Sequence, residues 1–410
     1  ANNTTASNNT GLDYASLAAN TTGTENTAVG KGSLDANTTA NYNVAMGSDS
    51  LTVNTTGAGN TGLGTYTLNA NTTASNNTAV GFSALLANTT GSENTAVGRL
   101  SLDANTTGTN NVAVGNSALG ANTTAASNTA VGDNALAANT TGTNNVAIGQ
   151  SALDANTTAS SNVAIGMNSL TDNTTGINNV AMGLSALANN TTANNNTGIG
   201  HGVLESNTTG AENTAIGSLA GDALTVGANV VAVGYKALTS DTKGFGSVAI
   251  GNQALENQNF TSNTDTFNTA VGYFAGNDIT TGDRNTFVGG LAGDATDDGV
   301  GNTAVGYLAL SANCGNANTA VGIECLTVCT GTSNAAMGQD AGGSLTSGGN
   351  NLFLGFQSGL TGSPGGAQTT GSNEIFLGDE NITAANIQVD WTVASDKRDK
   401  TDVTPMEMGL

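Results

Sequence analysis

Large apolar, small and polar residues recur along this chain with a period of 17 residues. We number the glycine of each repeat as position 0, as Gly98 is in the segment NTAVGRLSLDANTTGTN at 94–110. Glycine returns at this position in every repeat from Gly30 to Gly251, a large apolar residue precedes it at −1, and Leu recurs at +4. A short unit repeated at one fixed length is typical of a solenoid, in which each unit forms one coil.

The residues before each glycine predict a short strand, because side chains of a strand point alternately to its two faces. Position −1 is always large and apolar, so we expect it to fill the core of the coil together with the leucine at +4. The core residues predicted in this way include Val97, Leu102, Val114 and Leu119.

Position −2 is Ala or Gly in every regular coil, which indicates a face that something approaches closely. We expect that neighbour to be another copy of the chain. The residues then expected near a shared axis include Ala96, Ala113, Ala130, Ala147 and Ala164.

The glycine at position 0 fits either a turn that needs positive φ or a backbone too close to its neighbour for a Cβ. Asp13 occupies this position in the first coil, and Asp tolerates the left-handed region. This exception favours the positive-φ explanation.

Asparagine recurs at +7 and at −4, and identical side chains in register can form hydrogen-bonded ladders along a stack. Two alternatives remain open. Asn-Thr-Thr fits the acceptor motif for N-glycosylation, and the Thr pairs at +8 and +9 could form an ice-binding face. Adjacent strand residues point opposite ways, so only one Thr per coil is expected to face outward.

The period divides the chain. Residues 1–251 form the regular solenoid, 252–378 an irregular solenoid with longer loops, 379–394 a C-terminal stem strand, and 395–410 a charged segment. About 22 coils at about 4.8 Å each predict a rod about 100 Å long. The first residues are already in phase with the repeat, so we expect a piece of a longer protein.

Composition narrows the function classes. Aromatic residues make up 4% and charged residues 9% of the 410 residues, yet the strict register argues against disorder. The net charge of −22, with 8 basic residues, argues against nucleic-acid binding. No apolar run is long enough for a membrane span. The acidic residues form no calcium-binding ladder, so we expect no metal or other cofactor; a missed site would lie near Asp294, Asp297 and Asp298.

Two groups of residues depart from the repeat. Cys314, Cys325 and Cys329 lie within 16 residues of one another, and burial, a disulfide or a metal site could each explain them. Aromatic residues gather in the second half, where they either widen the core or form a contact surface on the longer loops. The region 252–284 is the best candidate for such a contact.

The Asn-[Thr/Val]-Ala-[Val/Ile]-Gly strand resembles the head repeat of trimeric autotransporter adhesins, over most of residues 9–378. The repeat here is longer than the adhesin repeat. The resemblance implies a left-handed parallel β-roll of three chains about one axis.

The end of the chain resembles a second family. Ser395 to Val403, SDKRDKTDV, is similar to the opening of the intramolecular chaperone of phage tail fibres and spikes, the endosialidase-type S74 peptidases. The segment from Asn373 to Gly378 and the following Ile/Val strand resemble the stem before it. The resemblance implies self-cleavage between Ala394 and Ser395 in a full-length precursor, with Ser395 as the nucleophile, although the chain ends long before such a domain would be complete.

Together these observations predict a homotrimeric, extracellular β-solenoid: the shaft and cell-surface attachment module of a phage tail fibre or fibre-like adhesin. The receptor, glycan or protein, is not specified. The alternatives are a bacterial trimeric surface adhesin and a monomeric ice-binding solenoid. No nucleophile, base and acid set is visible, so we do not expect an enzyme beyond the self-cleavage.

Overall fold

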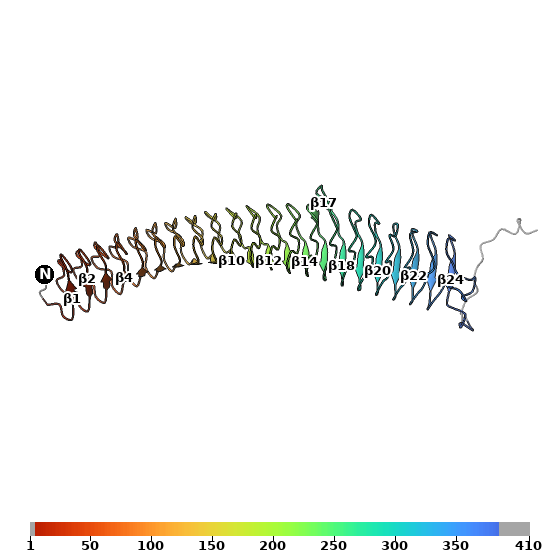
Figure 1. Cartoon of the computed structure of the whole chain (residues 1–410), viewed down its shortest axis with the longest axis horizontal. Coiled ribbons are helices and arrows are strands. Elements are labelled where there is room, and N and C mark those ends of the chain that lie inside the picture. The colour runs from red at the N-terminus through yellow and green to blue at the C-terminus, as the bar shows by residue number, and fades with distance from the viewer. Residues whose placement is uncertain (1–4, 385–410) are drawn as a thin grey trace, which may run out of the picture.

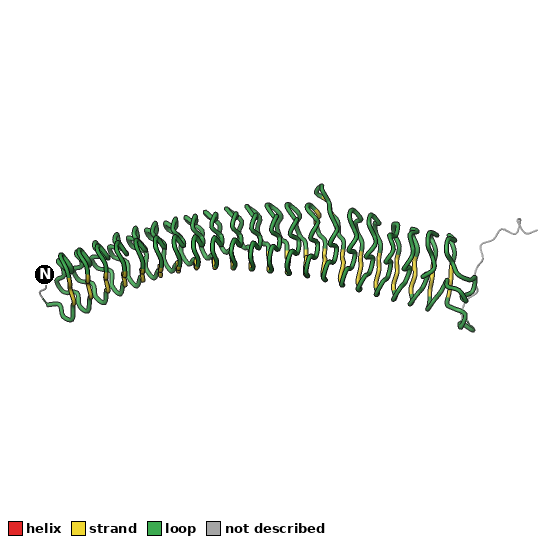
Figure 2. Tube along the Cα trace, viewed as in Figure 1, coloured by secondary structure: helices red, strands yellow, loops and turns green. Residues whose placement is uncertain are grey.

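The protein is built from very short strands joined by turns. The computed structural model describes residues 5–384, and the secondary-structure elements within that range are all strands (Figure 2). They are β1 (Thr10–Leu12), β2 (Thr27–Val29), β3 (Val44–Met46), β4 (Thr61–Leu63), β5 (Thr78–Val80), β6 (Thr95–Val97), β7 (Val112–Val114), β8 (Thr129–Val131), β9 (Val146–Ile148), β10 (Val163–Ile165), β11 (Val180–Met182), β12 (Thr197–Ile199), β13 (Thr214–Ile216), β14 (Val231–Val233), β15 (Gly244–Phe245), β16 (Val248–Ile250), β17 (Thr264–Asp265), β18 (Thr269–Val271), β19 (Thr286–Val288), β20 (Thr303–Val305), β21 (Thr319–Val321), β22 (Ala335–Met337), β23 (Leu352–Leu354) and β24 (Ile375–Leu377).

Twenty-two of these strands form one parallel sheet that runs the length of the molecule. In the regular half each residue pairs with the one 17 positions later, as Ala96 pairs with Ala113 and Ala113 with Ala130. The stack of coils is a long, gently curved rod (Figure 1). The predicted all-β parallel solenoid with a 17-residue repeat is therefore confirmed.

The glycine at position 0 ends each strand at a turn where a side chain would not fit. Gly98 has a φ of +137°, and a Cβ added to it would lie 2.3 Å from the carbonyl oxygen of Gly115 in the next coil. Positive φ and close backbone approach therefore both require glycine here. Asp13 also has positive φ, as expected from its place in the repeat.

The leucine at +4 fills the centre of the regular coils, except in the coil of Gly217, where +4 is Gly221 and Leu224 is buried instead. Leu102 and Leu119 are completely buried, which confirms their prediction as core residues. Their φ values are +51° and +55°, in the left-handed region. That conformation costs a residue with a Cβ about 1–2 kcal/mol, and burying the leucine side chain contributes about 1.5–3 kcal/mol, which offsets it.

The core changes composition in the C-terminal half. Phe287 replaces Ala at −2 and is completely buried, and the +4 positions on either side of it are Gly276 and Gly293. A Cβ added to either glycine would lie within 2.9 Å of the Phe287 ring. One aromatic ring therefore occupies the space of two leucine side chains. Phe353 bears the same relation to Gly342 and Gly359.

An insertion between β16 and β18 lifts a loop above the row of coils, where Figure 1 labels β17. There β17 pairs with β15 outside the main sheet. Asp241 lies buried below this loop, and its carboxylate accepts hydrogen bonds from Gln258 Nε2 at 2.7 Å and from the backbone N–H of Phe260 at 3.1 Å. Burial raises the pKa of Asp241, while these hydrogen bonds lower it.

Candidate association surface

The side chains at −3 and −1 of each strand point away from the coil interior. In β6, Thr95 and Val97 are both partly exposed on either side of the buried Ala96. Val114 is likewise partly exposed in β7. The prediction that Val97 and Val114 fill the core is therefore wrong: the core accepts only the middle residue of each strand.

The prediction that the −2 alanines face another chain is also wrong. The following five are fully buried within the single chain: Ala96, Ala113, Ala130, Ala147 and Ala164. The residue at −2 is small because the other side chains inside the same coil leave it little space. Where +3 is larger than usual, as at Thr67 and Val203, the −2 residue shrinks to Gly62 and Gly198, whose added Cβ would lie 2.8 and 3.2 Å from those side chains.

The outward strand face is a continuous apolar strip. The main sheet brings its −1 residues into a single column: Leu12, Val29, Met46, Leu63, Val80, Val97, Val114, Val131, Ile148, Ile165, Met182, Ile199, Ile216, Val233, Ile250, Val271, Val288, Val305, Val321, Met337, Leu354 and Leu377. A parallel column of Thr and Val stands at −3. We call these two columns the outer strand face. Exposed apolar patches of such extent mark interaction sites.

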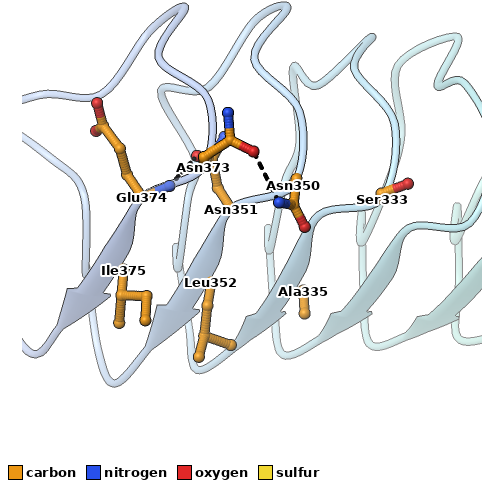
Figure 3. Close-up of a pocket in the computed structure, with 8 residues that line it drawn as sticks. All are labelled: Ser333, Ala335, Asn350, Asn351, Leu352, Asn373, Glu374 and Ile375. Atoms are coloured by element: carbon orange, nitrogen blue, oxygen red, sulfur yellow. Dashed lines mark hydrogen bonds between the residues drawn. The ribbon is translucent and has the colours of Figure 1, made fainter. Parts of the chain in front are cut away.

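The outer strand face ends in a hollow at the last coils (Figure 3). The hollow has a volume of about 340 Å³, and Ala335, Leu352 and Ile375 of successive strands point to the same side of the sheet there. Above them Asn350 Nδ2 donates a hydrogen bond to Asn373 Oδ1 at 2.8 Å. In these last three strands the −3 residue is Ala, Leu or Ile, where the earlier strands have Thr or Val. The outer strand face is therefore wholly apolar here and lies under a polar rim.

The asparagine ladders are present and buried. Asn105 Nδ2 donates to Asn88 Oδ1 at 2.8 Å and to the carbonyl oxygen of Gly108 at 3.0 Å. In the second ladder the backbone N–H of Asn111 donates to Asn94 Oδ1 at 3.0 Å. These buried amides supply hydrogen-bond partners for the backbone N–H and C=O groups of the interior turns. Because they are buried, they are not positioned as glycosylation acceptors.

Only the second threonine of each Thr pair is exposed, as expected, except at Thr157 and Thr158, which are both exposed. Thr106 Oγ1 donates to the carbonyl oxygen of Thr123 in the next coil at 3.0 Å, and Thr107 is the exposed member of the pair. The exposed threonines therefore form a single line along one corner of the rod. A single line of threonines contacts a flat ice surface over a smaller area than a plane of threonines would, which disfavours the ice-binding alternative.

Acidic side chains gather along one edge of the irregular coils. A hollow of about 370 Å³ is lined there by Asn257, Asp278, Thr280, Ala295, Asp297 and Asn313. Beside it, burial and then the charge of Asp278 raise the pKa of Asp294 to about 6, although backbone hydrogen bonds oppose the shift. Within residues 5–384, no group of three or more His, Cys, Asp or Glu side chains is arranged to hold a metal ion.

The three cysteines are buried free thiols. Cys325 occupies the small +3 position, and burial raises the pKa of its thiol to about 12. Burial likewise raises the pKa of Cys329 to about 11. Cys314 Sγ lies 3.2 Å from Thr296 Oγ1 of the preceding coil. These thiols belong to the interior of the stack.

The aromatic residues of the C-terminal half divide between the core and the surface. Phe287 and Phe353 are in the core, whereas Tyr235, Tyr273 and Tyr307 are about half exposed and all stand at +1. The predicted gathering of aromatic residues in the second half did not identify these tyrosines as one group. Their common phase was the signal that could have identified them as one surface.

The predicted cleavage junction Ala394–Ser395 and the charged segment 395–410 lie outside the described residues. Of the predicted stem strand 379–394, only residues 379–384 are described, and they form a turn and irregular chain after β24.

Comparison with protein-family models gives no match, and comparison with curated proteins gives none either. In residues 5–384, no helix is present that is long and apolar enough to cross a membrane. The assignment of function therefore rests on the solenoid and its surfaces.

Proposed function

We propose that this chain is the extended shaft of a fibre, which associates with copies of itself along the outer strand face and attaches to a cell surface. The observation that supports the proposal is the unbroken apolar column at −1. A strip about 100 Å long and about 7 Å wide approaches the area of about 800 Å² per partner found in stable interfaces. A rod with such a strip is suited to lateral association.

We propose three copies about one axis and a left-handed coil, as the resemblance to trimeric adhesin heads implies. The resemblance of residues 395–403 to a phage-fibre chaperone favours a virion tail fibre over the alternative of a bacterial surface adhesin. Both place the protein outside the cell. The interface we now propose differs from the sequence-based one, because the −2 alanines are inside the coil.

The test is the mass of the protein in solution, measured by sedimentation equilibrium. The double variant Ile148→Lys, Met182→Lys puts charges on the outer strand face, where each residue is 38% exposed. It should lower the mass from three chains to one while circular dichroism stays unchanged. The matched control is Thr141→Lys, Thr175→Lys at the exposed threonine corner, which should remain trimeric. A wild-type monomer would refute the proposal, and a dimer would refute the number of copies.

We also propose that a full-length precursor cleaves itself between Ala394 and Ser395. The hydroxyl of Ser395 adjoins the carbonyl carbon of the preceding peptide bond, so it can attack once a folded chaperone supplies a base. Mass spectrometry of the full-length gene product should find a mature chain ending at Ala394, and an uncut chain for Ser395→Ala. A mature wild-type chain that continues past Ser395 would contradict this mechanism.

A further inference from the structure

Three exposed tyrosines stand in one line on the C-terminal half of the rod. Tyr235, Tyr273 and Tyr307 occupy the +1 position of alternate coils and are 47%, 59% and 50% exposed. Backbone hydrogen bonds hold this column in register: the N–H of Gln253 donates to the carbonyl oxygen of Tyr235 at 2.9 Å, and the N–H of Leu291 donates to that of Tyr273 at 2.8 Å. Successive tyrosines are thus two coils apart, or about 10 Å.

Two of the three rings, those of Tyr235 and Tyr273, contact a neighbouring side chain. The Lys236 ammonium lies 5.7 Å from the centroid of the Tyr235 ring, and the rings of Tyr273 and Phe274 have centroids 4.4 Å apart. Rings that are already positioned lose little conformational freedom when a ligand binds.

The residues between the tyrosines leave room for a ligand that follows the column. Gly290 stands between Tyr273 and Tyr307, and a Cβ added to it would lie 3.7 Å from Tyr307 Cδ2. The Tyr307 ring therefore reaches over the place where a side chain is missing. Asn252, between Tyr235 and Tyr273, presents an exposed amide that can both donate and accept hydrogen bonds.

We propose that the line of Tyr235, Tyr273 and Tyr307 binds an extended, neutral, β-linked glycan. The C–H groups on one face of a β-linked hexopyranose carry partial positive charge and stack on the negative face of an aromatic ring. In an extended β-1,4-linked chain alternate sugars present the same face, and the repeat of two sugars matches the spacing of two coils. The net charge of −22 disfavours an anionic glycan. This inference rests on the proposed attachment role and names the class of receptor.

The geometry makes binding depend on glycan length. From Tyr235 to Tyr307 the column spans four coil steps, or about 19 Å. A hexasaccharide can therefore contact all three rings at once, whereas a disaccharide contacts one. Linked contacts reinforce one another because the second and third are intramolecular.

The test is calorimetric titration of the whole chain with cellohexaose and with the β-1,4-linked hexamer of N-acetylglucosamine. At least one of the two hexasaccharides should bind at least about tenfold more tightly than the corresponding disaccharide. Tyr273→Ala or Tyr307→Ala should weaken the binding of that hexasaccharide by about tenfold. Tyr273→Phe keeps the ring and should change the affinity less than about twofold. Tyr42→Ala is the matched control, because Tyr42 is 60% exposed on another corner of the rod.

Three results would overturn the inference: no binding of either neutral hexasaccharide by the wild type, equal losses in Tyr42→Ala and Tyr273→Ala, or tighter binding of an anionic hexasaccharide. If Tyr273→Ala lowers the mass of the assembly, the tyrosine column is a contact between copies and the glycan site is wrong. Failure of glycan binding in a wild-type trimer leaves the proposed shaft intact, whereas a wild-type monomer refutes the shaft independently of the glycan result.

Discussion

Replacing Phe287 with alanine tests whether one ring substitutes for two leucines in the irregular core. The ring is completely buried, and its nearest potential replacements are Gly276 and Gly293, which have no side chains to move into the space. Large-to-small substitution of a buried Phe costs about 3–5 kcal/mol, and the cost rises with the cavity that remains. Because neither glycine can fill the cavity, we expect the upper part of that range.

The substitution has a specific rescue. Gly276 and Gly293 have φ values of +58° and +63°, close to those of the leucines at +4 in the regular coils. Leucine is therefore compatible with the backbone at both sites. The Phe287 ring excludes it at Gly293, and the Phe287 ring together with the flexible end of Leu255 excludes it at Gly276, where each would lie 2.9 Å from an added Cβ. The triple variant Phe287→Ala, Gly276→Leu, Gly293→Leu restores the regular pattern and should recover most of the lost stability, whereas Gly276→Leu alone should destabilise the coil by overpacking.

Hydrogen exchange measures this effect locally, which matters because a solenoid opens in parts. Amide protection in β18, β19 and β20 should fall by about a hundredfold or more in Phe287→Ala, since each 1.4 kcal/mol is about tenfold. Phe267→Ala is the control, because Phe267 is 56% exposed. A loss of less than about 1 kcal/mol for Phe287→Ala, or a triple variant no more stable than the single one, would refute the substitution of one ring for two leucines.

Three further outcomes follow from the described side chains. Because the pKa of Asp294 rises from 3.8 to about 6 on folding, the stability that this carboxyl contributes is present below pH 3.8 and is lost as the pH rises through about 6. Asp294→Asn should therefore raise the melting temperature at pH 7.5 and leave it unchanged near pH 3.5. Equal changes in melting temperature at the two pH values would contradict this prediction. The three buried thiols should resist alkylation at pH 8 in the folded protein and react fully in denaturant, as peptide mass spectrometry can follow; fast labelling of native Cys325 would show that the interior opens. Melting curves with and without a chelator should coincide, and a lower melting temperature in the chelator would point to a metal near Asp297.

The repeat predicted the fold because one period determines every coil. Strand position, the glycine turn and the asparagine ladders all follow from residue type at a fixed phase, and each is present in the structure. What the repeat left ambiguous was the direction of each strand. Alternation requires −2 and −1 to face opposite ways, but it does not say which faces inward.

Hydrophobicity alone gave the wrong direction, because the regular coil has room for alanine but not for valine at −2. The information on which residue faces inward lay in paired departures from the repeat, where an unusual residue at −2 accompanies an unusual residue at +3 or +4. Gly62 coincides with Thr67 at +3, Gly198 with Val203, and Phe287 with glycine at +4 of its own coil and of the coil before it. In each case a larger side chain at one position accompanies a smaller one at another, so −2, +3 and +4 must share the same space. The tyrosine column escaped prediction for a related reason: its members are two coils apart, and only their common phase connects them.

The contrast between the regular and irregular halves bears on how copies align in the proposed assembly. The outer strand face of the regular coils repeats side chains of similar size and polarity, Val, Ile, Leu or Met at −1 and Thr or Val at −3, so two rods displaced by one coil would still make similar contacts. The repeating coils alone therefore specify only weakly how far one rod is displaced along another. The irregular half removes that ambiguity of register, because three features each occur at one place in the described chain: the insertion at β17, the two successive 16-residue coils between β20 and β22, and the hollow formed by Ala335, Leu352 and Ile375. A displacement of one coil would place each of these against a regular partner. In a fibre of identical copies, the irregular coils would therefore set the alignment that the regular coils then extend.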